Sequence, residues 1–528
     1  MFAKKMMGKT RLALGMGLLL CAATSGASPP QGGEYVPGVT SVAGDIDRSQ
    51  LPGPGPAPRI ALPVPERMTL SNGTKVLVVE RHTLPVVAML MVWPVGGLED
   101  PGDRPGMAAL CADMLDEGAG DKGALELAEA FARLGARIAT RSDLAATIVS
   151  SLTLARNFDE TFKLFADVVK RPQMNPKELD RVKNDTATAL KQRLDVPANL
   201  AQDVFEKTLY GASHRRGSPA AGTAEAVQLL DSLDMKWWHR ERLRPDDATL
   251  IVVGDITAAA LKPKLEAELA SWKAPPKRKE PIVQPAAAAA ERRIVVVDQP
   301  GKSQTVLAIG QTGVPRNHPD FFPLQVMNAI LGGQFNSRIN MNLREKRGYA
   351  YGAYSNFAFD RDGGPFAVRA SVKGATTKAS VDEVLKEIAK LRQGGVEADE
   401  LAQAKDLMVR SLARRFETVL QVATELAVIE IFKLPDDYLA TYADKVKAVS
   451  AGDVQRVANQ YLEPGKMTIV LAGDRKEVDK VGELNLGAIT YAEVPVPKAA
   501  PGGKAGKAKE PNKAPAAPKA PAAPAPAK

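Results

Sequence analysis

The sequence predicts a mixed α/β fold made of two homologous domains. Helical patterns alternate with short β-rich runs through the first half of the chain, which is typical of a mixed α/β domain. A helix–strand unit at the end of that half recurs 219 residues later without a gap. At 528 residues the chain is also too long for one compact core, so two or more domains are expected.

The elements of the first half follow from hydrophobic periodicity and turn residues. Lys75–Glu80 is expected to be a strand, and the continuously apolar Val86–Trp93 a strand buried on both faces. Residues 105–118 read as one amphipathic helix, entered by Pro-Gly and closed by Gly118. Further helices are expected at 125–134, 158–169, 176–194 and 200–209, and further strands at 138–140 and 147–154.

The repeated unit consists of a helix, a proline-containing turn, an apolar strand and a Gly-Asp terminator. Chance similarity is the alternative, but five identities in one register disfavour it. The starts of the two halves agree more loosely, where residues 76–79 resemble 294–297. The matched positions are Asp234/Asp453, Pro245/Pro464, Thr249/Thr468, Gly254/Gly473 and Asp255/Asp474.

Composition sets the predicted boundaries. Residues 1–27 read as a signal peptide, 28–60 as a Pro/Gly-rich tether and 61–273 as the first domain. A linker is expected at 274–293, the second domain at 294–493 and a disordered Ala/Pro/Lys tail at 494–528.

The signal peptide predicts a periplasmic or secreted protein. A retained membrane anchor is the weaker alternative, because the apolar run at 12–23 is shorter than the roughly 18–20 residues of a spanning helix. A lipoprotein modified at Cys21 is weaker still, since bulky Leu20 precedes the cysteine. After cleavage one cysteine remains, Cys111, so no internal disulfide is possible, and a small buried hydrophobe is expected there.

The net charge of +9 comes from the two ends of the chain. The N-terminus contributes +4 and the tail +6, which leaves about −1 for the residues between. The folded body is therefore nearly neutral, and no nucleic-acid partner is indicated.

Residues 105–118 resemble the inverted zinc-binding helix of the pitrilysin/insulinase family of metallopeptidases. On that frame the first His of His-x-x-Glu-His falls on Ala109, the Glu on Ala112 and the second His on Asp113. The family's third ligand, a Glu, would fall near Ala189, with Asp185 one turn earlier. The resemblance therefore implies a degenerate zinc motif, with no metal or other cofactor in this chain.

The histidine census agrees with that interpretation. The chain has four histidines, and no two of them lie within five residues of each other, so no helical His pair can form a zinc face. Each is more typical of a surface or packing residue than of a ligand. They are His82, His214, His239 and His318.

The second half keeps a different signature. Residues 331–338 (Leu-Gly-Gly-Gln-Phe-Asn-Ser-Arg) and 343–351 (Leu-Arg-Glu-Lys-Arg-Gly-Tyr-Ala-Tyr) resemble the Gly-rich turn and Arg/Tyr segment of the same family's C-terminal domain. The resemblance implies that Arg344 and Tyr351 hold the substrate backbone and the oxyanion beside a zinc in another subunit. A guanidinium and a phenol suit this task, because neither titrates near pH 7. Without the family, Arg344 would read as a helix-end cation and Tyr351 as a strand aromatic.

Together the two motifs indicate a non-catalytic subunit of a heterodimeric zinc endopeptidase. Its expected partner is a family relative that carries the zinc, and its expected substrate a peptide or unfolded polypeptide. The family fold implies that each domain is an antiparallel-rich sheet covered by helices, and that the two form half of a clam-shell chamber. The alternatives are a structural or peptide-binding scaffold without a proteolytic role, and an autonomous peptidase that would need a metal site the sequence does not reveal.

Overall fold

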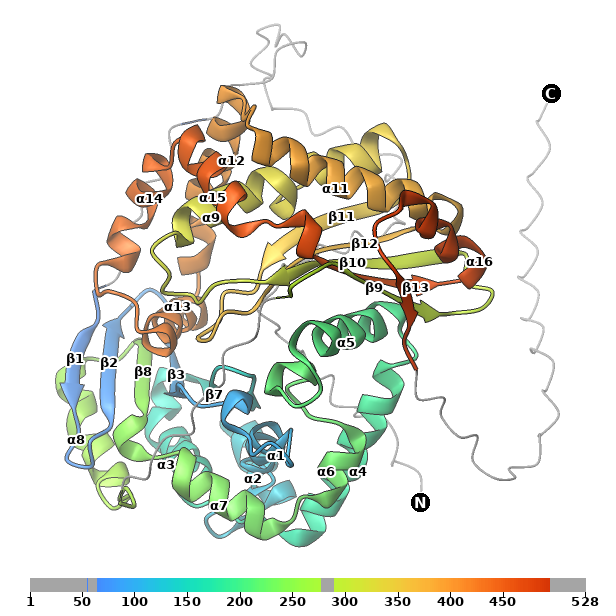
Figure 1. Ribbon diagram of the computed structural model, residues 1–528. Coiled ribbons are helices and arrows are strands. Elements are labelled where there is room, and N and C mark those ends of the chain that lie inside the picture. The colour runs from blue at the N-terminus through green and yellow to red at the C-terminus, as the bar shows by residue number, and fades with distance from the viewer. Residues whose placement is uncertain (1–54, 56–63, 277–288, 494–528) are drawn as a thin grey trace, which may run out of the picture. The chain divides into compact units, whose positions relative to one another are not determined.

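The computed structural model describes Gly55 and residues 64–276 and 289–493 (Figure 1). The predicted signal peptide, most of the tether, most of the linker and the tail lie outside these residues. All described residues except Gly55 belong to one compact unit, Ala57–Lys528. Below, the first half means residues 64–276 and the second half means residues 289–493.

Each half contains one six-stranded sheet, so the predicted mixed α/β class is confirmed. The strands of the first sheet, in spatial order, are β1 (Glu66–Thr69), β2 (Lys75–Glu80), β8 (Thr249–Gly254), β3 (Val86–Trp93), β7 (Thr147–Leu154) and β6 (Arg137–Ser142). Those of the second are β14 (Ile489–Tyr491), β9 (Arg293–Asp298), β13 (Thr468–Gly473), β10 (Gln304–Thr312), β12 (Pro365–Lys373) and β11 (Ala350–Phe357). A two-stranded ribbon pairs β4 (Gly118–Ala119) with β5 (Lys122–Gly123).

The two sheets share one topology over five strands. In each, the first long strand runs parallel to the strand of the repeated unit, and the next three pairings are antiparallel. The aspartates of the two Gly-Asp terminators also make equivalent hydrogen bonds. Asp255 accepts a hydrogen bond from His82 Nδ1 (2.7 Å), and Asp474 accepts one from the N–H of Gly301 (2.8 Å). Each carboxylate thereby fixes the loop that follows the first long strand of its sheet.

Helices cover both faces of both sheets. The helices of the first half are α1 (Met107–Met114), α2 (Ala124–Arg133), α3 (Phe158–Lys170), α4 (Pro176–Arg193), α5 (Pro197–Tyr210), α6 (Ala224–Leu229), α7 (Ser232–Arg242) and α8 (Ala258–Leu269). Those of the second half are α9 (Phe321–Asn328), α10 (Arg338–Asn340), α11 (Thr377–Gln393), α12 (Ala398–Ser411), α13 (Val419–Phe432), α14 (Tyr438–Ala448), α15 (Ala451–Tyr461) and α16 (Arg475–Val478). None of the described helices is both long and apolar enough to cross a membrane.

The two halves exchange one helix each. Helix α5 belongs to the first half, yet it lies against the second sheet (Figure 1). Its Leu200 and Phe205 share a buried cluster with Val297 and Val470 of that sheet. Helix α13 belongs to the second half and packs against β3 and β8 of the first sheet (Figure 1). Because each sheet needs the other half's helix to bury one of its faces, the halves share a continuous core.

The helix expected at 105–118 is shorter than predicted. It begins at Met107 after Gly106, whose φ is +100°, and ends at Met114. Gly118 does not close it; this glycine, with φ +114°, starts the ribbon strand β4. The chain leaves the helix early because residues 115–117 form a turn that carries it into the ribbon.

Candidate functional site

Helix α1, which carries the degenerate zinc motif, is held at its start by a buried carboxylate. Asp100 accepts hydrogen bonds from the N–H groups of Gly106 (2.7 Å) and Ala108 (2.8 Å) and from Nε of Arg215 (2.9 Å). These bonds satisfy N–H groups of the first helical turn that have no partner within the helix. Burial raises the pKa of Asp100 to about 6, although Arg215 and the two N–H groups oppose that shift. Asp100 and Arg215 thus fix the start of the helix.

The three motif positions do not form a zinc site. Ala109 and Ala112 have no donor atom, and Ala112 is fully buried. Asp113 offers one carboxylate, and it already has an interaction within the protein. A zinc ion needs three or four nitrogen, sulfur or oxygen ligands. In the two described segments, no group of three or more His, Cys, Asp or Glu residues is placed to hold a metal ion.

The region between α1 and α4, where the third ligand was expected, contains an arginine-centred ion cluster. Arg181 on α4 pairs with buried Glu117, just beyond α1, and with Glu178 (3.0 Å) and Asp185 (3.2 Å) on its own helix. Ala189 is exposed and has no ligand atom. Asp185 is therefore committed to an ion pair, and charge pairing links α1 to α4.

The remaining candidate ligands also have structural partners. His82 bonds Asp255, His239 is within 2.8 Å of the carbonyl of Val169, and His318 bonds the N–H of Asp320. His214 accepts from the N–H of Arg216, beside the start of a short helical turn. Cys111 is buried and donates to the carbonyl of Met235 (3.6 Å), and burial raises the pKa of its thiol. The expectation of a small buried hydrophobe at Cys111 is confirmed.

The backbone of the Gly-rich turn in the second half lies in close contact with β11. It forms η5 (Ala329–Gly333), a π-helical turn that ends in Gly332 and Gly333. A Cβ added to Gly332 would lie 2.6 Å from the backbone nitrogen of Ser355 on β11. A Cβ on Gly333 would lie 2.7 Å from the side-chain nitrogen of Asn328, which donates to the carbonyl of Ser355. The two glycines therefore allow an approach that no larger residue permits.

The Arg/Tyr segment begins in a second π-helical turn, η6 (Met341–Lys346), which is anchored on its inner side. The amide nitrogen of buried Asn342 donates to Glu383 (2.9 Å) and Glu387 (2.7 Å) on α11. Arg347 donates to the amide oxygen of Asn342 (2.8 Å) and pairs with Glu383 (2.9 Å). Burial acts to raise the pKa of Glu383, but Asn342 and Arg347 outweigh it and lower the pKa. With these contacts made by Asn342 and Arg347, Arg344 is left at the surface.

Arg344 and Tyr351 lie together in the structure. The guanidinium carbon of Arg344 is 5.0 Å from the centre of the Tyr351 ring and 4.7 Å from that of the Phe335 ring. Tyr351 is 85% exposed and Phe335 55% exposed. The one ion pair of Arg344 joins its Nε to neighbouring Glu345 (3.2 Å), and no described residue hydrogen-bonds its two terminal nitrogens. We call Phe335, Arg344 and Tyr351 the aromatic clamp.

A buried asparagine connects the two segments that carry the clamp. Asn340 is fully buried; its amide nitrogen donates to the carbonyl of Phe335 (2.6 Å), and its oxygen accepts the N–H of Ala353 (3.1 Å). Ala353 lies where the pairing of β11 with β12 changes register, between Ala350 and Ala353. Tyr351 sits within this irregular stretch, so Asn340 fixes the backbone on both sides of Arg344.

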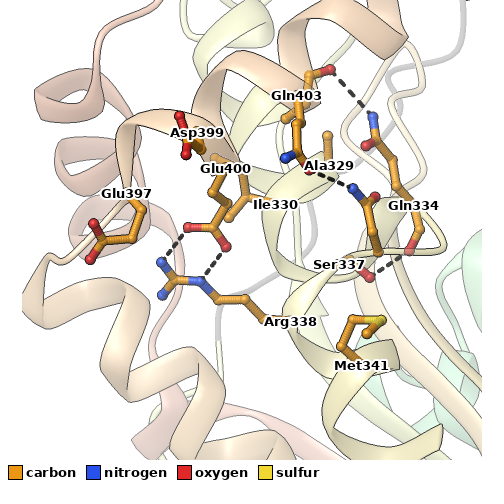
Figure 2. A pocket seen from close by; sticks show the side chains of 12 residues that line it. Ala329, Ile330, Gln334, Ser337, Arg338, Met341, Glu397, Asp399, Glu400 and Gln403 are labelled. Atoms are coloured by element: carbon orange, nitrogen blue, oxygen red, sulfur yellow. Dashed lines mark hydrogen bonds and ion pairs between the residues drawn. The ribbon is translucent and has the colours of Figure 1, made fainter. Parts of the chain in front are cut away.

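The opposite side of the Gly-rich turn lines a pocket of about 480 Å³ (Figure 2). Arg338 donates to both carboxylate oxygens of Glu400 on α12 at 2.7 Å, and Ser337 donates to the carbonyl of Gln334 (2.6 Å) (Figure 2). Glu397 and Asp399 carry the other carboxylates of the lining. The Ser-Arg pair of the signature thus ties the turn to itself and to α12.

Chemically, the motif positions of α1 offer a single carboxylate, Asp113, which is too few ligands to hold a zinc ion. The aromatic clamp presents N–H donors with a fixed positive charge and a phenolic O–H at the surface, which suit a carbonyl or carboxylate oxygen. No sequence pattern singled out Phe335 or Asn340. The available signal for Phe335 was a large aromatic residue two positions after the Gly332-Gly333 pair.

Two family models match the described region. The model described as "Insulinase (Peptidase family M16)" matches residues 75–223, and that described as "Peptidase M16 inactive domain" matches residues 230–408. A relative from Bacillus subtilis (strain 168), named an uncharacterized zinc protease, is 25% identical over 354 residues, which are 67% of this chain and 85% of the relative. A Helicobacter pylori relative named a non-peptidase homolog is 22% identical over 412 residues, 77% of this chain and 94% of the relative.

Solved structures show the same fold. The crystal structure of a peptidase M16 inactive domain from Pseudomonas fluorescens matches with a TM-score of 0.72 and 26% identity, over 78% of this chain and 98% of that one. A structure described as a protease from Helicobacter pylori matches with a TM-score of 0.73 and 21% identity, over 78% of this chain and all of that one. At that identity the second match concerns the fold alone.

Proposed function

Because the chain belongs to the pitrilysin/insulinase (M16) peptidase family as a non-catalytic member, we propose that it is the non-catalytic subunit of a heterodimeric zinc endopeptidase. In this proposal a separate subunit, a family relative with an intact His-x-x-Glu-His motif, holds the zinc. This chain supplies Arg344 and Tyr351 to the shared site and needs no cofactor of its own.

The observation that carries the proposal is the proximity of Arg344 and Tyr351. The neighbouring polar side chains Arg338, Asn342 and Arg347 are all committed to contacts within the fold, whereas no described residue hydrogen-bonds the terminal nitrogens of Arg344, and Tyr351 is 85% exposed. The Arg344 guanidinium is partly exposed and lies near two rings, so holding it in place for an incoming anion or carbonyl costs little free energy. A developing oxyanion on a scissile carbonyl is one such group.

The remaining parts of the proposal concern the setting of the site. The two halves form half of a clam-shell chamber that a second subunit closes, and the two sheets derive from an internal repeat. A peptide or unfolded polypeptide binds extended and adds a strand to an exposed sheet edge. Strand β6 is suited to this role, because it is outermost in the first sheet and lies beside α1. The pair works in the periplasm or outside the cell.

A scaffold without a proteolytic role is the second candidate. It is favoured by the many contacts that anchor the Gly-rich turn and η6 for structural reasons, such as the bidentate Arg338–Glu400 pair. Packing of this kind could preserve the segment even where Arg344 touches no substrate. Only loss of hydrolysis on changing Arg344 separates the two candidates.

The test is hydrolysis of an internally quenched peptide by the full chain co-purified with a zinc-bearing relative. Arg344→Ala should lower kcat/KM by tenfold or more and Tyr351→Phe by a smaller factor, because both donate to the transition state. The matched controls are Arg475→Ala and Tyr491→Phe. Arg475→Ala removes a second exposed Arg–Tyr stack with a 4.1 Å separation, and Tyr491→Phe removes only the hydroxyl that donates to Asp479. Unchanged hydrolysis with Arg344→Ala and Tyr351→Phe would overturn the proposal and leave the scaffold candidate.

A further inference from the structure

Phe335 is placed unusually for a large apolar side chain. It is 55% exposed, although the buried core of the second half lies directly beneath the turn that carries it. Its carbonyl is tied down by fully buried Asn340, so the exposure follows from a fixed backbone position. Exposing an aromatic ring forgoes part of the roughly 1.5–3 kcal/mol that burying such a side chain would contribute.

The contact that Phe335 makes instead is with Arg344. The Phe335 ring is nearer to the guanidinium carbon (4.7 Å) than the Tyr351 ring is (5.0 Å). A free arginine side chain samples many rotamers, whereas a guanidinium packed on aromatic faces is restricted to fewer. The ion pair with Glu345 adds little restraint, since that carboxylate is 43% exposed.

The two rings come from different segments that Asn340 connects. Phe335 precedes α10, and Tyr351 follows η6 at the irregular start of β11. The Asn340 amide hydrogen-bonds the carbonyl of Phe335 and the N–H of Ala353, so the ring-bearing segments move together with respect to Arg344. This arrangement sets the orientation of the guanidinium through Phe335 and Asn340, which no ligand need touch, together with the Tyr351 ring.

We propose that Phe335 is a positioning residue for Arg344, and that it acts by holding the guanidinium plane so that the terminal N–H donors point outward to a peptide carbonyl or carboxylate oxygen. The inference rests on the proposed function, in which Arg344 binds substrate, and adds a residue that the Arg/Tyr signature does not include. Phe335 acts through the face of its ring, so another aromatic residue at this position should serve.

The test compares Phe335→Leu, which removes the ring but keeps an apolar side chain, with Phe335→Tyr, which keeps the ring. In the assembled pair, Phe335→Leu should lower kcat/KM for the quenched peptide about two- to fivefold, the range of one exposed cation–π contact. Phe335→Tyr should restore the parental value. In an Arg344→Ala background, Phe335→Leu should have no further effect, because its action passes through Arg344.

The outcomes separate this inference from the proposed function. A Phe335→Leu effect that adds in full to that of Arg344→Ala, or that Phe335→Tyr shows equally, would overturn the positioning role and leave the proposed function standing. If Arg344→Ala itself has no effect, the proposed function fails. In that case, NMR of the chain labelled with 15N-arginine still tests whether the Phe335 ring packs on the Arg344 guanidinium. Phe335→Leu should move the Arg344 Hε resonance downfield, because it removes the ring current of Phe335. An unmoved resonance would refute this contact.

Discussion

Arg216 of the first half donates through its Nε to both carboxylate oxygens of Asp362 in the second half, at 2.9 and 2.8 Å. Its guanidinium also reaches Asp360 (2.7 Å), and the arginine is only 4% exposed. Arg361, which lies between these two aspartates in the sequence, donates to the carbonyl of Pro94 (2.6 Å). The loop that joins β11 to β12 is thereby fixed to the first half. One of its anchor points, Pro94, lies six residues before Asp100, whose carboxylate caps α1.

Replacing Arg216 should therefore weaken the contact between the halves. Arg216→Ala removes a buried cation from two carboxylates whose side chains are only 17% and 14% exposed, and the free energy of unfolding should fall by about 3–5 kcal/mol. Denaturant unfolding followed by tryptophan fluorescence measures it. Arg67→Ala is the control, because Arg67 also joins the halves, through Glu430 and Asp436, but its side chain is 44% exposed. Its loss should cost no more than about 1 kcal/mol, and an equal effect of both variants would contradict the argument.

Introducing the motif's Glu at position 112 should destabilise the protein. Ala112→Glu places a carboxylate where the side chain is fully buried, so unfolding should become easier by more than about 3 kcal/mol. Ala109→Glu, one turn earlier on a partly exposed position, is the control and should change stability much less. Thermal unfolding of both variants gives the comparison.

The same helix also sets an expectation for metal content. The parental protein, dialysed against zinc and then buffer, should retain no stoichiometric zinc by elemental analysis, since Asp113 is the only donor among the three motif positions. One bound zinc together with peptidase activity of the chain alone would contradict the non-catalytic assignment.

His239 predicts a loss of stability in mild acid. Burial lowers its pKa below the ordinary 6.5, and its Nε2 lies 2.8 Å from the carbonyl of Val169, to which the neutral ring donates. The unfolded chain therefore binds this proton more readily than the folded one. The contribution of His239 is present above about pH 6.5 and is lost as the pH falls through and below that value.

The measurement is the free energy of unfolding at pH 7 and pH 5 for the parental protein and for His239→Gln, which cannot titrate. The parental protein should lose more stability than the variant over this interval. The difference between the two proteins cancels other groups, including His82, whose pKa is raised by Asp255 and Glu80 and whose effect has the opposite sign. Equal losses would refute the assignment to His239.

The sequence patterns predicted the local elements closely where hydrophobic periodicity was strong. β2, β3 and β7 begin and end where predicted, and α3 and α4 differ from their predicted bounds by one residue at one end. The helix at 105–118 was predicted too long, because Gly118 looked like a helix terminator but serves the ribbon strand β4. A positive-φ glycine marks a special backbone position without revealing which element it belongs to.

Of the residues in the candidate site, only Arg344 and Tyr351 could be predicted from the sequence. Arg344 and Tyr351 stood out through the resemblance of residues 343–351 to a known segment, and their proximity is what the structure describes. Phe335 and Asn340 could not be singled out, because an exposed aromatic and a buried amide give no periodic signal. Their roles depend on which backbone groups of β11 lie opposite the Gly-rich turn.

The sequence by itself determined the alternation of helices and strands, the absence of zinc donors at Ala109 and Ala112, and the matching order of elements in the two halves. Those features depend on residue type and local spacing. Tertiary structure alone decided that α5 covers the sheet of the second half and that α13 covers the sheet of the first half. It also decided that Arg181 joins α4 to Glu117, just beyond α1, and that Arg344 has two aromatic partners. The reason is physical: which apolar face covers which sheet, and which charge meets which partner, depends on long-range packing that no local pattern specifies.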